Sequence, residues 1–237
     1  MKWKELLMFI LLSVAIAPAL ALLSYFYLRK EISAEPSKLL LHTFIYGAIL
    51  TFPILFIQHV LQEEQIFSSL FLHQAIVTSA LEEFFKWLVL IIAIYKHVEF
   101  DDPYDGILYG ASVALGFATV ENILYLLNFG MDEAILRAIL PISSHALFGV
   151  LMGYYIGRAK FTTLTKSRYE ILFALIAPLF LHTVYNSILS ITGLELLLMV
   201  PFMLFLWLFS LSKVKKAHIL SRIKRYAEHE YYVKEKV

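Results

Sequence analysis

IFSSLFLHQAIVTSALEEFFKWLVLIIAIY, residues 66–95, is an apolar stretch with three charged side chains near its middle: Glu82, Glu83 and Lys86. A charged side chain at the centre of a bilayer costs about 2.5–3.5 kcal/mol on insertion scales, so such residues are rare there and mark functional sites. The lysine follows one glutamate by three residues and the other by four, which places all three on one helix face. The ammonium can therefore pair with either carboxylate and leaves one in excess.

The composition of the chain agrees with a membrane environment. Of its 237 residues, 60% are hydrophobic and only 16% are charged, whereas soluble domains carry about 25% charged residues. A net charge of +1 gives no field that would attract nucleic acid, and the absence of cysteine excludes disulfides and thiolate metal sites. We therefore predict an all-α polytopic membrane protein whose surroundings are the lipid bilayer, with no nucleic acid partner.

Seven stretches are long enough for transmembrane helices, which need about 20 apolar residues each. The predicted spans are 6–28, 39–61, 67–95, 106–129, 138–156, 171–191 and 194–211. They make residues 1–212 a transmembrane domain and leave 213–237 as a basic cytoplasmic tail. The first span contains Ala19-Leu20-Ala21, which resembles a signal-peptide cleavage site. Its apolar run continues past this triplet, so we interpret it as a retained span.

The positions of Lys and Arg predict the orientation. Sixteen of the 20 basic residues fall in the tail or in loops on the same side of the membrane as the tail. Lys2, Lys4 and Arg137 fall on the other side. Because cytoplasmic loops are enriched in Lys and Arg, we predict an external amino terminus and a cytoplasmic carboxyl terminus.

Small residues recur at four-residue spacing in two of the spans. Gly106 and Gly110 lie in the fourth span, and Gly149, Gly153 and Gly157 lie in the fifth. This spacing lets helix backbones approach closely. We predict that these glycines serve helix packing rather than chemistry.

Further polar residues occur inside the fourth, fifth and sixth spans. They are Glu121, His145, His182 and Asn186. At a rise of about 1.5 Å per residue, these side chains and Glu82 lie between the bilayer midplane and its outer surface, within roughly 10–15 Å of one another in depth. The simplest arrangement is one central polar cavity that opens outward.

Peptide-bond hydrolysis is the chemistry that suits such a cavity. A glutamate in an apolar pocket binds a proton more readily than in water and can act as a general base, while His and Asn side chains can stabilise the oxyanion. The sequence has neither an HExxH zinc helix nor a GxSxG elbow. Ser143 and Ser144 beside His145 would suggest a serine protease, but sequence neighbours of a histidine are usually poorly aimed at it.

Four motifs, in this order along the chain, resemble the PrsW family of membrane proteases. They are EEFFK at 82–86, DGILYGASVALGFATVENILY at 105–125, SHALFGVLMG at 144–153 and LHTVYN at 181–186. The family belongs to a wider group of glutamate-type intramembrane proteases that includes CAAX prenyl endopeptidases and bacteriocin-processing relatives. The resemblance implies that residues 1–212 are a transmembrane protease domain in the plasma membrane of a bacterium.

The resemblance also implies roles for the polar residues. Glu82 and Glu83 would form the catalytic core, with Lys86 in support, and both glutamates remain candidates for the base. Glu121 occupies the second motif, where CAAX-type relatives carry a histidine. His145, His182 and Asn186 complete the third and fourth motifs.

The expected reaction is the first, extracytoplasmic cut in a single-pass anti-sigma factor during envelope stress, with a glutamate-activated water. We expect no metal cofactor. The alternative is zinc held by Glu82, Glu83, His145 and His182, with a water in the open position. A proton-coupled membrane transporter and a non-catalytic scaffold subunit of a protease assembly are the competing hypotheses, because both also place polar residues inside a membrane bundle.

Overall fold

The computed structural model describes residues 2–31, 37–66, 72–129 and 134–235. All regular structure in these ranges is helical. The elements are α1 (Lys2–Leu28), α2 (Ser37–Glu63), η1 (Leu72–Val77), α3 (Thr78–Val89), η2 (Leu90–Ile94), α4 (Asp105–Phe129), α5 (Ala134–Lys160), α6 (Leu164–Leu189) and α7 (Glu195–Glu235). The segments η1 and η2 are π-helical, and they continue α3 at both ends because Val77 and Leu90 keep helical backbone angles.

The predicted all-α polytopic membrane fold is confirmed. Each of the seven predicted spans corresponds to a helix, although residues 67–71 of the third lie outside the described residues. Within the described ranges, α1, α2, α4, α6 and α7 are long and apolar enough to cross a bilayer. The third predicted span corresponds to η1, α3 and η2, of which α3 carries the three charged residues, and the fifth corresponds to α5.

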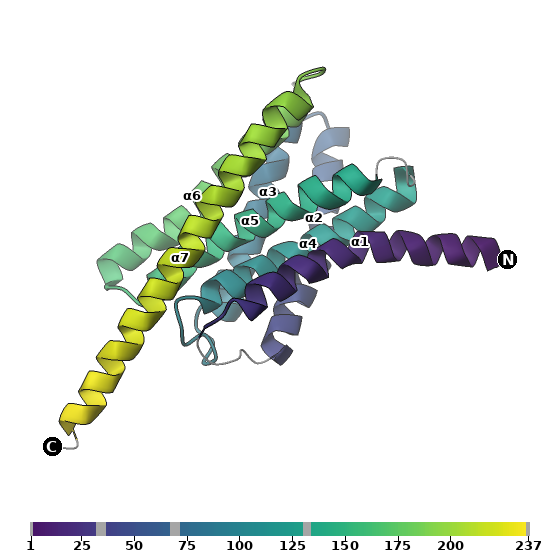
Figure 1. Cartoon of the computed structure of the whole chain (residues 1–237). Helices are drawn as coiled ribbons and strands as arrows, with labels where there is room; N and C mark the ends of the chain where they lie inside the picture. The colour runs from purple at the N-terminus through teal and green to yellow at the C-terminus, as the bar shows by residue number, and fades with distance from the viewer. Residues whose placement is uncertain (1, 32–36, 67–71, 130–133, 236–237) are drawn as a thin grey trace.

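The centre of the bundle is formed by α4 and α5, with α7 crossing diagonally in front of them (Figure 1). Nearly every residue of α4 from Ile107 to Ala118 is buried. A methyl group on Gly106 would collide with the carbonyl of Gly153, and one on Gly110 would collide with the carbonyl of Gly149. The predicted packing role of these glycines is therefore confirmed.

The same kind of contact joins α2 to the other side of α4. A Cβ atom on Gly47 would overlap the carbonyl of Val113, and one on Gly116 would overlap that of Phe44. Hydroxyl groups bind across this close interface, where Ser112 donates a hydrogen bond to a backbone carbonyl of α2 over 2.9 Å. The position of α2 against α4 is thus fixed by backbone contact.

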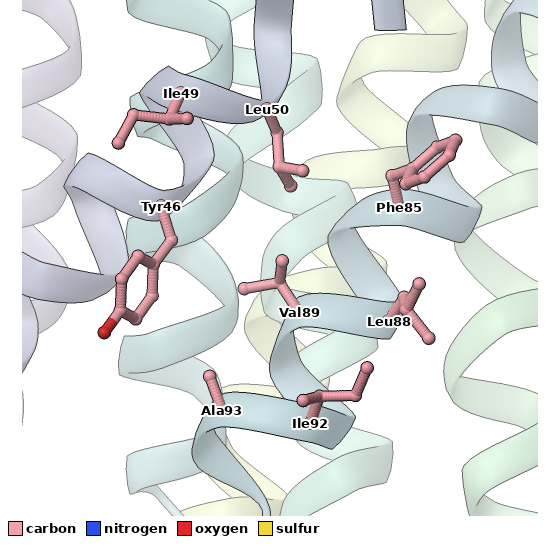
Figure 2. Close-up of a pocket in the computed structure, with 8 residues that line it drawn as sticks. All are labelled: Tyr46, Ile49, Leu50, Phe85, Leu88, Val89, Ile92 and Ala93. Carbon is pink, nitrogen blue, oxygen red and sulfur yellow. The ribbon is translucent and has the colours of Figure 1, made fainter. Parts of the chain in front are cut away.

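The outer surface of the bundle is apolar. Large hydrophobic side chains such as Phe9, Phe56, Phe180 and Leu208 are exposed on four different helices, as expected where lipid replaces water as the solvent. One hollow in this surface lies between α2 and the helix formed by α3 and η2 (Figure 2). We call this hollow the α2–α3 groove.

The last helix is longer than the predicted seventh span. At about 1.5 Å per residue, the 41 residues of α7 extend well past a hydrocarbon core of about 30 Å. The basic tail, as far as Glu235, therefore continues the helix. Val214, Ala217 and Ser221 share one buried face of it.

That buried face covers a second polar centre, the capping cluster, formed by Lys30, Asp102, Asp105 and Ser221. Lys30 Nζ lies 2.6 Å from Asp105 Oδ1, with both side chains buried. The Ser221 hydroxyl donates a hydrogen bond to Asp102 Oδ1. These contacts join the end of α1, the start of α4 and the tail part of α7.

Candidate active site

The site is built on the inner face of α3. Ser79, Glu82, Glu83 and Lys86 are buried, and their spacing of three, four and seven residues places them on one stripe. Phe84, on another face of the same helix, is exposed. The helix therefore turns its polar stripe inward, as expected for a helix surrounded by lipid.

Lys86 is the hub of the charged group. Its ammonium donates to Glu83 Oε1 over 2.9 Å and to Glu82 Oε2 over 3.4 Å, and it lies 3.1 Å from His145 Nδ1. These three acceptors match its three N–H donors. The ammonium also lies 4.2 Å from the centre of the Phe117 ring. The sequence predicted that the lysine can pair with either glutamate, and the structure places it in contact with both.

His145 on α5 connects this group to α4. An ammonium can only donate, so His145 Nδ1 accepts, and the proton of the neutral ring lies on Nε2. That nitrogen is 3.1 Å from Glu121 Oε2 and 3.9 Å from Glu82 Oε2. Glu121 is therefore positioned to fix the tautomer and orientation of His145.

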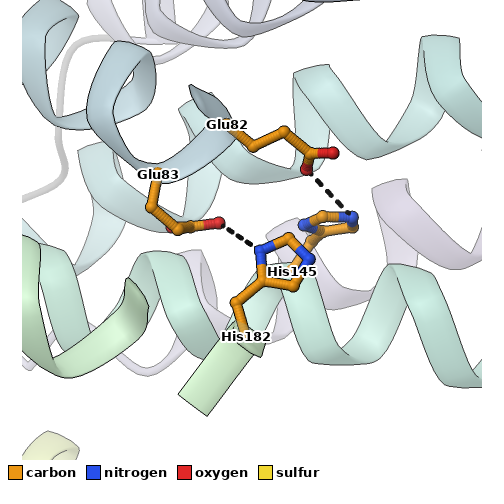
Figure 3. Close-up of side chains that lie close together, drawn as sticks. All are labelled: Glu82, Glu83, His145 and His182. Atoms are coloured by element: carbon orange, nitrogen blue, oxygen red, sulfur yellow. Dashed lines mark hydrogen bonds and ion pairs between the residues drawn. The ribbon is translucent and has the colours of Figure 1, made fainter. Parts of the chain in front are cut away.

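His182 on α6 binds Glu83 (Figure 3). Its Nδ1 donates to Glu83 Oε1 over 2.9 Å, and the Phe148 ring stacks on it at 5.0 Å between centroids. Glu83 Oε1 thus accepts two hydrogen bonds, one of them from Lys86. Glu83 Oε2 is buried and has no hydrogen-bond partner in the described part of the chain.

The structure therefore brings together polar residues of α3, α5 and α6. Counting residues along the spans predicts similar depths in the bilayer for these residues. We call Glu82, Glu83, Lys86, His145 and His182 the central cluster. All five side chains are buried. Glu121 touches its edge and is partly exposed.

Asn186, the remaining predicted site residue, lies one turn after His182. Its amide donates to Ser79 Oγ over 3.0 Å, and the Ser79 hydroxyl donates to the carbonyl of Ala75. Asn186 thus joins α6 to α3 beside the central cluster. The Ser144 hydroxyl donates to the carbonyl of Pro141 in its own helix, which gives no support to the serine protease alternative.

One contributor was missed from the sequence. Gln58 on α2 is buried, and its amide donates to Glu82 Oε1 over 3.3 Å. Both oxygens of Glu82 are therefore engaged, since Lys86 contacts the other. An amide within an apolar membrane helix is itself a signal for such a contact, and it was available in the sequence.

The donor set is suited to a divalent cation. Glu82, Glu83, His145 and His182 each offer one ligand atom, and these atoms all lie within 4.8 Å of one another. Two carboxylates and two imidazoles are ligands that zinc accepts, and Glu83 Oε2 is buried without a hydrogen-bond partner among the described residues. Lys86 contacts three of the same four side chains, so its ammonium competes for them. The expectation of a metal-free site is not confirmed.

Comparison with known proteins gives matches over most of the chain. Residues 35–210 match the profile of the PrsW family, described as intramembrane metalloproteases. The chain is 48% identical over 211 residues to protease PrsW of Bacillus subtilis (strain 168), covering 89% of this chain and 96% of that protein.

Two further proteins named protease PrsW match with similar coverage. That of Geobacillus kaustophilus (strain HTA426) is 51% identical over 210 residues, which cover 89% of this chain and 93% of that protein. That of Clostridioides difficile (strain 630) is 34% identical over 212 residues, which cover 86% and 89%. No solved structure matches the chain.

Proposed function

The chain belongs to the PrsW family of intramembrane proteases and is therefore a membrane peptidase; from this premise we propose that the central cluster is its catalytic site. The reaction is hydrolysis of a peptide bond in a single-pass membrane anti-sigma factor, on the extracytoplasmic side. The observation that carries this assignment is the group of buried carboxylates and imidazoles contributed by three helices.

We assign the general base to Glu83. Its Oε1 is held by Lys86 and His182, while its buried Oε2 has no hydrogen-bond partner among the described residues. That oxygen can accept a proton from a water molecule that attacks the scissile carbonyl. Glu82 is less suited to this role because Gln58 and Lys86 occupy its two oxygens.

Each polar side chain near Glu83 has a separate role in the reaction. Lys86 fixes the geometry of both carboxylates and offsets part of their charge. Glu121 fixes the orientation of His145 through its Nε2. His182 and Asn186 orient the substrate and stabilise the oxyanion that forms on its carbonyl. Glu121 also exchanges protons with His145.

A divalent cation is compatible with the same residues. Held by Glu82, Glu83, His145 and His182, it would lower the pKa of a bound water and polarise the substrate carbonyl. Lys86 would then lie close to the cation, so we expect metal affinity to rise when this lysine is replaced by a neutral residue.

We propose the orientation in the membrane that the positions of Lys and Arg predict. The amino terminus lies outside and the carboxyl terminus lies in the cytoplasm of a bacterial cell. In this orientation the central cluster lies in the outer half of the bilayer. A cut there separates the extracytoplasmic part of the substrate from its membrane-spanning part.

Proteolysis with purified components tests the proposed function. The chain and a single-pass anti-sigma factor from the same bacterium are reconstituted together in liposomes, and products are identified by mass spectrometry. We expect one cut on the extracytoplasmic side of the substrate helix, which Glu83→Gln abolishes. Full activity in both Glu83→Gln and Glu82→Gln would remove the glutamate mechanism.

The same assay separates metal-dependent from metal-free hydrolysis. Strong chelation followed by zinc addition should leave the rate unchanged if Glu83 acts alone. Loss and recovery of cleavage would instead assign Glu82, Glu83, His145 and His182 as metal ligands. Metal content of the purified protein, measured with and without His182→Ala, provides a readout that does not depend on activity.

A further inference from the structure

The helix that carries the carboxylates borders the α2–α3 groove with its other face. The groove is a cavity of about 290 Å³. It is lined by Tyr46, Ile49 and Leu50 from α2 and by Phe85, Leu88, Val89, Ile92 and Ala93 from α3 and η2 (Figure 2). Apart from the Tyr46 hydroxyl, the lining side chains are hydrocarbon, so the groove suits an apolar occupant.

The groove opens toward the lipid. Ile49 on one wall is 59% exposed and Ile92 on the other is 73% exposed. In a bilayer, this hollow is filled by a lipid chain, by a second copy of the protein or by an apolar helix of a partner. The position of the groove relative to the central cluster distinguishes among these occupants.

Each helix that forms a wall of the groove also carries a residue of the central cluster or a residue that binds it. On the α3 side, Val89 is about 9 Å along the helix axis from Glu83, at 1.5 Å per residue. On the α2 side, Leu50 is about 12 Å from Gln58 along the axis, and the Gln58 amide binds Glu82. The groove therefore begins within about two helical turns of the carboxylates.

A single-pass substrate brings its own apolar helix to the site. That helix is joined covalently to the scissile bond, so a bond held at Glu83 places the helix within a few turns of the carboxylates. The helix must also rest on a lipid-facing surface. A groove with two helical walls accepts a third helix by packing of ridges into grooves.

We propose that the α2–α3 groove docks the apolar transmembrane helix of the substrate and so holds the scissile bond at the central cluster. This assignment rests on the proposed function. In the proposed orientation, the groove lies on the cytoplasmic side of the cluster. The docked helix therefore runs inward from the cut, as a single-pass protein cut on its extracytoplasmic side requires.

Filling the groove tests this assignment. Ile92→Trp places a bulky ring in the groove, and Leu208→Trp is the control because Leu208 on α7 is 72% exposed and does not line the groove. Two probes are compared: the full anti-sigma factor, and a peptide with its extracytoplasmic residues but without the membrane helix. We expect Ile92→Trp to lower the ratio of full-length to peptide cleavage about tenfold, and Leu208→Trp to leave the ratio unchanged.

Crosslinking tests the occupant without any cleavage. The chain has no cysteine, so Ile49→Cys introduces a single thiol, and Glu83→Gln in the same chain keeps the substrate intact. With one cysteine in the inner half of the substrate helix, we expect a disulfide between the two proteins. Leu208→Cys in place of Ile49→Cys should give none.

The outcomes separate the two levels of the assignment. If the natural chain cleaves the full anti-sigma factor but Ile92→Trp behaves like Leu208→Trp, the docking assignment is wrong and the proposed function stands. A disulfide between two copies of Ile49→Cys, without substrate, would assign the groove to a self-interface. Equal crosslinking by both cysteines would mean that only lipid fills the groove. Absence of any cleavage by the natural chain contradicts the proposed function, whereas the crosslink still reports docking.

Discussion

Two buried polar centres in this molecule contain the same kinds of charged groups but are held in different ways. In the central cluster, side chains bind the carboxylates: Lys86 and His182 bind Glu83, and Lys86 and Gln58 bind Glu82. One oxygen, Glu83 Oε2, has no hydrogen-bond partner in the described ranges. This centre has a buried acceptor that a reactant can use.

The capping cluster is held by the backbone. Asp105 Oδ2 accepts hydrogen bonds from the amides of Asp101 and Asp102, and Asp102 Oδ1 accepts from the amide of Tyr104. Backbone amides neither titrate nor leave their positions while the fold persists. Buried charge alone therefore does not mark a catalytic site. The central cluster is distinguished by side-chain donors and by one buried acceptor, Glu83 Oε2, without a hydrogen-bond partner among the described residues.

Replacing Lys86 should produce the largest effect. Lys86→Met leaves Glu82 and Glu83 buried without an ammonium, and removing one partner of a buried ion pair costs about 3–5 kcal/mol. We also expect a loss of cleavage of about 100-fold or more, because the ammonium that holds both carboxylates in place is removed from beside the base. Thermal unfolding in detergent and the proteoliposome assay measure both quantities. Lys96→Met, at an exposed position, is the matched control, and near-normal cleavage by Lys86→Met would contradict the role of the lysine.

Replacing the lysine of the capping cluster should affect stability alone. Lys30→Met removes the ammonium from buried Asp105, with an expected loss of about 3 kcal/mol, at the low end for buried pairs, because two amides still bind that carboxylate. Cleavage per folded molecule should stay within a factor of about two, since no reacting group is touched. A stable Lys30→Met protein that has lost activity would erase the distinction between the two centres.

Gln58 should contribute less than the charged residues. Gln58→Leu keeps the size of the side chain but removes a hydrogen bond to a carboxylate, and such bonds contribute about 1.5–3 kcal/mol. Because about 1.4 kcal/mol changes a rate tenfold, we expect cleavage to fall roughly tenfold. Gln62→Leu, one turn later at an exposed position, should have no effect. Equal rates for the two variants would show that the contact with Glu82 is dispensable.

The smallest effect should come from an exposed ion pair beside the capping cluster. Arg222 Nη2 lies 2.7 Å from Glu31 Oε2, and its hydrogen bond holds the pKa of Glu31 below the ordinary value of 4.5. A lowered pKa means that the contact stabilises the fold above pH 4.5 and that this contribution is lost as the pH falls through the lowered value. Arg222→Ala should therefore lower the unfolding temperature slightly at pH 7 and by progressively less as the pH falls below 4.5. A difference in unfolding temperature that grows as the pH falls would contradict this expected pH dependence.

Much of the fold was predictable because the signals are local. The pairing of Lys86 with the two glutamates follows from their spacing on one helix, and the packing of Gly106 against Gly153 follows from four-residue repeats. The shared depth of Glu82, His145 and His182 followed from counting residues along each span. Helix rise and helix periodicity are enough to predict these three features.

The remaining features depend on the rotation and length of the helices, which residue counting does not give. Depth placed Asn186 near the cluster, but the structure directs its amide to Ser79. The contact of Gln58 with Glu82 depends on how α2 is rotated against α3. The sequence predicts the tail as a separate basic segment, whereas the tail continues α7 as far as Glu235, and Val214 and Ala217 at its start are buried.

One paired measurement tests the central claim most directly: cleavage rate and unfolding temperature for Glu83→Gln and Asp105→Asn, each compared with the natural chain. We expect Glu83→Gln to lose cleavage by about 100-fold or more while keeping its unfolding temperature. We expect Asp105→Asn to unfold several degrees earlier while each folded molecule still cleaves at the natural rate. Cleavage at the natural rate by folded Glu83→Gln would exclude Glu83 as the base.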